Sequence, residues 1–439
     1  MPDLITIADD FTGASDQAGM LARAGASSLL ILSERYPVNP ADWDAITYAT
    51  RLRSTPVPEA RRLSRRLLKR AESLQPRMVQ YKYCSTFDST PEGNIGPILD
   101  VALDLFNLRG AIVVPALPVN GRTTYQGHHF VHGLPLDESP MRHHPLNPMT
   151  DANLVRWLKR QTTRPVALLP YEIVQRGPQT IRRQLEALWA TNQQYVVIDC
   201  LDQRHVRTIA RATSDLPFIS GSSALAMELP SIWSRVSPLG GAELQPAQAV
   251  PTRSRTSPPL LALSGSCAAQ TLRQLDHADT FTILRPDLTP LLTASPTRVA
   301  QALWRDVSAA FRTTKRVLVA TSQPAAERLA CPDAREFGLR IEHFLGALAR
   351  LAVRRGGLRH LLVAGGETSG AVCQALGLGA VEILRELAPG VPLCRALPDR
   401  DLVIALKGGN FGPDDFFNTA ATAAQQVWPS TLQGATRQC

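Results

Sequence analysis

Short apolar runs alternate with segments of helical spacing along most of this 439-residue chain, and no other feature constrains its fold as strongly. This alternation is typical of mostly parallel sheets covered by helices on both faces. We expect helices at 57–75, 93–106, 173–191 and 222–235. The expected strands are 3–8, 28–32, 45–49, 78–83, 110–115, 166–169, 194–198, 216–219, 259–264, 279–284, 315–320, 359–364, 391–396 and 401–406.

The alternation is interrupted at 236–258, where glycine, proline, serine, threonine and arginine predominate. Such a composition favours an interdomain linker. The sequence therefore predicts two α/β domains with mostly parallel sheets and a ligand cleft between them. We place the first domain at 1–240, the linker at 241–258 and the second domain at 259–439.

Charge and cysteine usage narrow the class of protein. The chain has 47 Lys and Arg against 38 Asp and Glu, but the basic excess is scattered, which argues against nucleic acid as a partner. The seven cysteines are widely spaced without a Cys-x-x-Cys pair, so reduced thiols and a cytoplasmic location are expected. Neither a secretory signal nor a membrane-spanning run is visible, and we expect no membrane partner.

Two adjacent carboxylates, Asp9 and Asp10, follow the apolar run at 4–7 and precede Gly13. Ligands of open α/β sheets lie beyond the carboxyl ends of strands. Carboxylates there can orient substrate hydroxyls, accept a proton or hold a cation. The alternative is that one of them only caps the following helix. We take Asp10 as the first candidate for a catalytic residue and Asp9 as the second.

Further polar residues follow other expected strands of the first block. A guanidinium after the strand at 45–49 can bind a carboxylate with two parallel hydrogen bonds, although a surface salt bridge is the alternative. Arg51 and Arg53 both stand there, and the choice between them stays open. The candidate substrate-binding residues are Arg53, Lys82, Asp88, Asn94 and Asn120.

Three strand-to-turn junctions of the second block are rich in small residues: 264–267, 365–370 and 407–412. Glycine permits close approach of a ligand to the backbone, and free N–H groups at a helix N-terminus favour phosphate. Neither a Walker loop nor a dinucleotide fingerprint is present. The candidate nucleotide-binding residues are Ser264, Ser266, Gly365, Gly366, Glu367, Thr368 and Gly408.

These motifs, in this order, resemble the four-carbon acid sugar kinase family over most of the chain. The opening motif is 9–14, and the nucleotide motifs are the three junctions. The stretches 82–89, 93–96, 120–123 and 144–151 are most similar to the 3-oxo-tetronate 4-kinase branch. Two departures are a Ser-Gly-Ser-Ser turn at 220–223, where Gly-Gly-Ser is more usual, and Leu52 within the Arg51–Arg53 loop.

The resemblance implies a sugar-acid-binding domain followed by a nucleotide-binding domain. It implies an ATP-dependent kinase acting on the terminal C4 hydroxyl of a four-carbon acid sugar, with 3-oxo-tetronate as the expected substrate. D-threonate or D-erythronate 4-kinase is the alternative, and a non-catalytic nucleotide-binding regulator is a remote one. The expected partners are the sugar acid and ATP, with Mg²⁺ as part of the nucleotide complex. Metal ligands, the base, substrate stereochemistry and a homodimeric state remain open.

Overall fold

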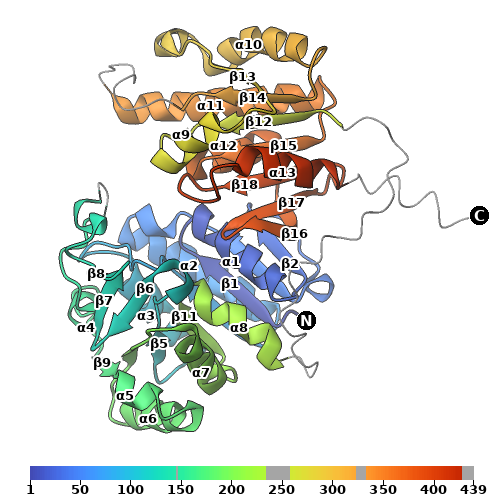
Figure 1. The fold of residues 1–439 in the computed structure, drawn as a ribbon. Helices are drawn as coiled ribbons and strands as arrows, with labels where there is room; N and C mark the ends of the chain where they lie inside the picture. Colours follow the sequence, from blue (N-terminus) through green and yellow to red (C-terminus); the bar gives the residue numbers. More distant parts are fainter. Residues whose placement is uncertain (145–146, 234–257, 323–332, 428–439) are drawn as a thin grey trace, which may run out of the picture. The chain divides into compact units, whose positions relative to one another are not determined.

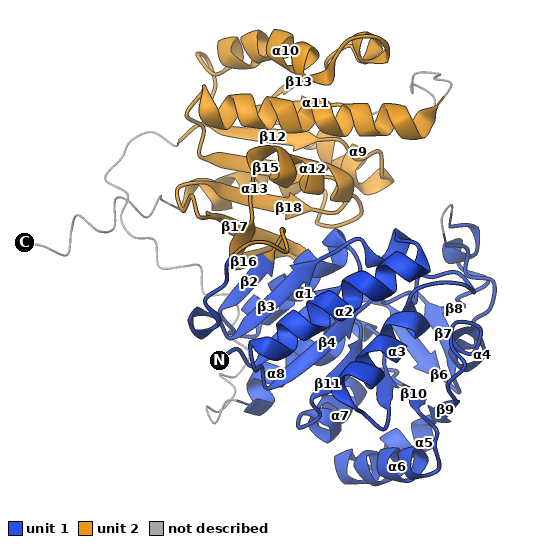
Figure 2. Ribbon diagram, turned by 180° about the vertical axis from the view of Figure 1, so that it is seen from behind, with its two compact units in different colours: residues 1–30, 37–239 blue, residues 31–36, 240–439 orange. Residues whose placement is uncertain are grey.

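The computed structural model describes residues 1–144, 147–233, 258–322 and 333–427, and the expected linker at 241–258 lies outside them except for its last residue. The chain divides into two compact units, coloured separately in Figure 2. Unit 1 comprises Met1–Leu30 and Pro37–Leu239, and unit 2 comprises Ile31–Tyr36 and Gly240–Cys439. Each unit is described by itself below.

The main sheet of unit 1 has the strand order β11-β4-β1-β3-β2 (Figure 1). The pairs β1–β3, β1–β4 and β4–β11 are parallel, as expected. Ala8 is in register with both Ala49 and Lys82, and Lys82 is in register with Gly221, so these strands end along one edge. The bounds are β1 Leu4–Ala8, β2 Ser28–Ile31, β3 Ala45–Ala49, β4 Met78–Lys82 and β11 Phe218–Gly221.

The remaining strands of unit 1 form two smaller sheets. Three of the expected strands make a separate parallel sheet of order β5-β10-β9, with bounds Ala111–Val113, Tyr195–Ile198 and Val166–Leu169. A single bridge, Val114 to Gly221, connects it to the main sheet. A side chain at Gly221 would overlap the Val114 carbonyl oxygen, so glycine permits this close approach. An unexpected antiparallel sheet joins β6 Arg122–Tyr125, β7 His128–Val131 and β8 Leu134–Pro135.

Helices of unit 1 lie at 57–73, 95–106 and 223–233, as expected, whereas those at 154–158 and 203–213 were not expected. The helix expected at 173–191 is divided, because Gly177 lies between two shorter helices and Pro178 starts the second. The α-helices are α1 Phe11–Arg23, α2 Val57–Ser73, α3 Ile95–Phe106, α4 Leu154–Leu158, α5 Tyr171–Val174, α6 Pro178–Ala190, α7 Gln203–Thr213 and α8 Ser223–Trp233. Short 3₁₀ turns are η1 Pro40–Asp42, η2 Leu52–Ser54, η3 Pro118–Asn120 and η4 Pro140–His143.

Unit 2 has a sheet of order β16-β17-β18-β15-β12-β14-β13. The run from β18 to β13 is parallel, whereas β17 is antiparallel to both of its neighbours. Strand β16 was not expected, because Glu382, Arg385 and Glu386 interrupt its apolar pattern. The strands are β12 Leu260–Ser264, β13 Thr282–Leu284, β14 Arg316–Ala320, β15 His360–Ala364, β16 Ala380–Ala388, β17 Val391–Leu397 and β18 Val403–Lys407.

The helices of unit 2 are α9 Ala269–Asp276, α10 Pro296–Ala310, α11 Ala334–Arg354, α12 Gly366–Leu376 and α13 Phe416–Gln425, with the 3₁₀ turn η5 Thr289–Leu292. The segment Ile31–Tyr36 belongs to this unit because it contacts Gly379: the N–H groups of Leu32 and Ser33 donate to the Gly379 carbonyl at 2.9 and 3.0 Å. Across the described ranges, no helix has the length and apolar character needed to cross a membrane.

Candidate active site

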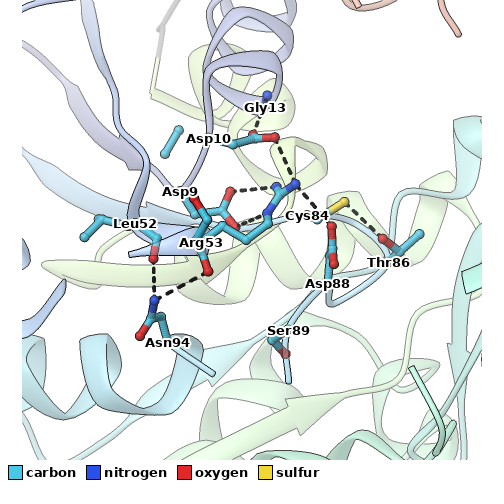
Figure 3. A network of polar contacts seen from close by, with 12 residues as sticks. Asp9, Asp10, Gly13, Leu52, Arg53, Cys84, Thr86, Asp88, Ser89 and Asn94 are labelled. Atoms are coloured by element: carbon cyan, nitrogen blue, oxygen red, sulfur yellow. Dashed lines mark hydrogen bonds and ion pairs between the residues drawn. The ribbon is translucent and has the colours of Figure 1, made fainter. Parts of the chain in front are cut away.

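The two carboxylates that follow β1 have different local roles. The Asp9 N–H donates to the Lys82 carbonyl at 2.9 Å, which extends the β1–β4 pairing by one residue. Asp10 is the N-cap of α1, and its Oδ1 accepts the Gly13 N–H at 2.7 Å. The capping interpretation therefore holds for Asp10, but its second oxygen, Oδ2, points toward Arg53 (Figure 3).

Arg53 lies at the centre of three carboxylates (Figure 3). Its Nε and Nη2 each donate to one oxygen of Asp9 at 2.9 Å, which makes a two-pronged pair. Its Nη1 lies 2.9 Å from Asp10 Oδ2 and 3.2 Å from Asp88 Oδ2. A guanidinium has five N–H groups, and three of those of Arg53 donate to Asp9 and Asp88, while Asp10 pairs with Nη1 as an ion pair. The sequence allowed carboxylates here to hold a cation, and in the structure they hold the Arg53 guanidinium.

Burial strengthens this ion cluster. Asp9 is 1% exposed, and burial raises its pKa while the Arg53 guanidinium opposes that shift. Burial alone would lower the pKa of Arg53, but the charges of Asp9 and Asp10 raise it well above its ordinary value. Arg53 therefore keeps its charge. Three carboxylates against one guanidinium leave an excess of negative charge, which Lys82 partly offsets.

Asn94 positions the loop that carries Arg53. Its Nδ2 donates to the carbonyls of Leu52 and Thr55, the second at 2.7 Å, and these residues flank Arg53 in and after η2. The Asn94 Oδ1 is buried without a hydrogen-bond partner. Arg51, the other arginine left open by the sequence, is exposed. The structure thus brings Arg53, Asp9, Asp10, Asp88 and Asn94 together.

The side chains of two predicted residues, Lys82 and Asn120, make no direct hydrogen bond or ion pair with this network among the described residues. Lys82 is 4% exposed, and its Nζ lies where a side chain at residue 13 would be, so a side chain there would displace the lysine. No direct hydrogen bond or ion pair of Lys82 Nζ is found in the described part of the chain. Asn120 ends η3 and is half-buried, and its backbone carbonyl accepts from the Arg122 guanidinium.

The three glycine-rich junctions of unit 2 follow adjacent strands. Ser264 is in register with Ala364, and Ala364 is in register with Lys407, so β12, β15 and β18 end side by side. Gly365 caps α12 with φ +130°, and a Cβ there would lie 2.7 Å from the Thr368 hydroxyl. Glycine is therefore required at Gly365 for both reasons. This edge also carries Gly366 and the exposed Glu367 in the first turn of α12.

Hydroxyl groups and one lysine hold these junctions in place. The Ser264 hydroxyl is buried and bonds to the Ser322 hydroxyl at 2.7 Å, whereas Ser266 Oγ accepts the Ala268 N–H and packs against Gly409. Lys407 is the first residue of the third junction, 407–412, but was not among the candidate nucleotide-binding residues. Its Nζ donates to the carbonyls of Gly408 and Gly409 at 2.9 and 3.1 Å, and burial lowers its pKa to about 8.

Sequence reasoning also passed over Asp16 and Arg122 of unit 1. Asp16 lies on α1 and is 7% exposed, and Ser223 donates to its Oδ2 at 2.7 Å. Arg122 begins β6, and burial lowers its pKa. Asp16 is an acidic residue among the small and apolar residues of the first helix, and this pattern could have identified it from the sequence. No group of three or more His, Cys, Asp or Glu side chains within the described ranges is arranged to hold a metal ion.

Residues 4–229 match the family described as the Sugar-binding N-terminal domain, and residues 261–417 match the Nucleotide-binding C-terminal domain. The fold and these matches define a two-domain protein of sugar-binding and nucleotide-binding type. A protein of Brucella melitensis, named 3-oxo-tetronate kinase, is 36% identical over 96% of this chain and 95% of its own length. One of the same name from Methylobacterium radiotolerans is 38% identical over 94% of this chain and 97% of its own length.

Two solved structures share the fold over almost the whole chain. A protein from Salmonella typhimurium LT2 superposes with a TM-score of 0.85 at 34% identity, over 95% of this chain and 98% of that chain. A Haemophilus influenzae protein superposes with a TM-score of 0.78 at 32% identity, over 95% of this chain and 99% of that chain. The chain belongs to the four-carbon acid sugar kinase family.

Proposed function

We propose that this chain is an ATP-dependent kinase that phosphorylates the C4 hydroxyl of 3-oxo-tetronate to give 3-oxo-tetronate 4-phosphate. The observation that carries the proposal is the similarity over almost the whole chain to relatives named 3-oxo-tetronate kinase, at 36% to 38% identity in the two examples above. Unit 1 would bind the sugar acid and unit 2 the nucleotide, in line with the two matched domains.

Asp10 is the carboxylate best suited to receive the acceptor hydroxyl. Its side chain is 28% exposed, whereas those of Asp9 and Asp88 are 2% and 5% exposed. Each carboxylate oxygen can accept two hydrogen bonds, so Asp10 can take a substrate hydroxyl in addition to its contacts with Gly13 and Arg53. We propose that Asp10 orients this hydroxyl and accepts its proton, while Arg53 holds the carboxylate of Asp10 in position.

The nucleotide would bind at the carboxyl ends of β12, β15 and β18, with its phosphates near the N-terminus of α12. Free N–H groups there favour negative charge. ATP arrives as its Mg²⁺ complex, in which the ion is held largely by phosphate oxygens and water together with one or two protein oxygens. Glu367, in the first turn of α12, offers a carboxylate there, and the next residue, Thr368, offers a hydroxyl.

The proposed step is an in-line displacement. The C4 oxygen of the acid forms a bond to the γ-phosphorus of ATP as the bond between that phosphorus and the bridging oxygen of ADP breaks. The hydroxyl proton passes to Asp10, and the negative charge leaves with ADP. Catalysis of this kind depends on positioning and charge neutralisation, with little covalent chemistry for the protein.

The test is ADP release with a panel of 3-oxo-tetronate, D-threonate and D-erythronate, with the product identified by phosphorus NMR. The proposal expects the highest kcat/KM with 3-oxo-tetronate. A higher value with threonate or erythronate would assign the chain to a sister activity of the family. Nucleotide binding without any ADP release would favour the non-catalytic regulator. A cytoplasmic location and a homodimeric state stay predictions, to be tested by fractionation and light scattering.

A further inference from the structure

Buried polar atoms without partners lie beside the Arg53 cluster. Asp16 accepts from Ser223 through Oδ2, but its Oδ1 is buried without a hydrogen-bond partner. Arg122 Nε is likewise buried without a partner, and this arginine makes no ion pair with an acidic residue in the described part of the chain. Such groups are costly to bury unless something satisfies them. They therefore point to a polar ligand.

The topology of unit 1 brings these groups to one edge of the main sheet. Lys82 ends β4, in register with Ala8 before α1 and with Gly221 before α8. Asp16 comes from α1, and its partner Ser223 is the first residue of α8. Lys82 thus ends one strand, and Asp16 and Ser223 lie in the helices that follow the two strands next to it.

Arg122 reaches the same edge from the smaller sheets. The Ser222 hydroxyl donates to the Ala116 carbonyl at 2.8 Å, just before the segment that leads to Arg122. On the other side, His129 of β7 contacts the Ser85 carbonyl at 2.7 Å through Nε2. A carbonyl only accepts, so Nε2 carries the proton and Nδ1 accepts from Thr124 of β6 at 3.0 Å. The sheet bearing Arg122 is thereby fixed to the loop that follows Lys82.

The charges are complementary to a hydroxy acid. Asp16 lies within electrostatic reach of both Lys82 and Arg122, and neither cation has a direct carboxylate partner in the described part of the chain. Arg53 already donates three hydrogen bonds to Asp9 and Asp88, and its Nη1 also lies 2.9 Å from Asp10, so it is poorly placed to receive a substrate carboxylate with two bonds. An incoming carboxylate would give Lys82 and Arg122 the direct carboxylate contact that they lack among the described residues.

We infer that Arg122 and Lys82 bind the carboxylate of the sugar acid and that Asp16 Oδ1 accepts the hydroxyl on the adjacent carbon. The inference rests on the function proposed above and names the substrate feature that this edge recognises, an α-hydroxycarboxylate. Arg122 is then the residue that distinguishes an acid from a neutral sugar. The C4 hydroxyl at the other end of the four-carbon chain is left for Asp10.

The test compares two substrates that differ only in the carboxylate. Erythrulose is the neutral four-carbon ketose with CH₂OH in place of the carboxylate of 3-oxo-tetronate. In the Arg122→Gln variant, kcat/KM for 3-oxo-tetronate should fall about 10–150-fold, the loss typical of one charge-assisted contact. The value for erythrulose should stay within about threefold, which also shows that the variant folds. Arg142→Gln is the matched control, because Arg142 is exposed and, among the described residues, its side chain donates its one hydrogen bond to the Asp137 carbonyl.

Equal losses on both substrates, or no loss on either, would overturn the inference. Calorimetry without nucleotide separates it from the proposed function. If the wild-type chain phosphorylates no four-carbon compound but binds D-erythronate more tightly than Arg122→Gln does, the kinase proposal fails and the carboxylate site stands. If the wild-type chain binds neither 3-oxo-tetronate nor D-erythronate, the carboxylate site is refuted.

Discussion

Replacing Arg53 by alanine should destabilise unit 1 much more than replacing Arg51. Arg53 supplies four contacts of 2.9 to 3.2 Å to three aspartates, of which Asp9 is 1% exposed. Removing one partner of a buried ion pair costs about 3–5 kcal/mol, because the remaining charge is left uncompensated. The Arg53 side chain is itself 18% exposed, so water can enter the space, and we expect the lower end of that range.

A loss of about 3 kcal/mol corresponds to a melting temperature lower by roughly 6–12 °C for a unit of this size. The loss should also depend on pH. Without Arg53, burial raises the pKa of Asp9 further above its unfolded value. A carboxyl with a raised folded-state pKa costs nothing below its unfolded pKa, and the penalty grows as pH rises from the unfolded pKa to the folded-state pKa, above which it is complete. The deficit should therefore be smaller near about pH 5 than near about pH 8.

The assay is urea unfolding of wild type, Arg53→Ala and Arg51→Ala at both pH values, followed by steady-state kinetics. Arg51→Ala should stay within about 0.5 kcal/mol of wild type, as exposed substitutions usually do. Arg53→Ala should also lower kcat, because Asp10 loses the group that orients it. An Arg53→Ala variant as stable as Arg51→Ala, with only the KM for the acid raised, would refute this reasoning and make Arg53 a substrate ligand.

Three further outcomes are expected. Asp10→Asn should lower kcat by about 10²–10⁴-fold with little change in the KM for ATP, and since Asn is also a good N-cap, the melting temperature should hardly change; near wild-type turnover excludes Asp10 as the base. Gly365→Ala should weaken ATP binding in calorimetry, because φ +130° and the Thr368 contact both oppose a side chain, whereas Gly370→Ala in the same helix meets nothing within 4 Å and should leave it unchanged; equal affinities contradict a nucleotide site at this turn. Burial lowers the pKa of Lys407 to about 8, so between that value and the ordinary lysine pKa the unfolded state binds more protons than the folded state. Urea unfolding across this pH range should therefore show stability rising with pH in the wild type but not in Lys407→Met.

Local sequence sufficed for most of the secondary structure and for the first residue of the site. Short apolar runs bounded by turn residues identified β1, β3, β4 and the parallel strands of unit 2, because strand formation there depends on a few neighbouring side chains. The carboxylate of Asp10 before a helical pattern was enough to predict a helix start, since capping is a contact over three residues. The other polar candidates could also be predicted locally, because they lie at or after the ends of expected strands in the sequence.

The sequence by itself thus determined the α/β class, the positions of most strands and the family. Tertiary structure alone decided which polar residues meet, because strand order brings together residues far apart along the chain. The Arg53 contacts with Asp9 and Asp88 span 44 and 35 positions, and nothing local distinguishes Arg53 from Arg51. The separate β5-β10-β9 sheet, the Arg122 Nε without a hydrogen-bond partner among the described residues and the buried Asp16 depend equally on packing between distant segments. Short-range pattern fixes where a strand begins and ends, whereas its neighbours are chosen by the burial and charge pairing of the whole fold.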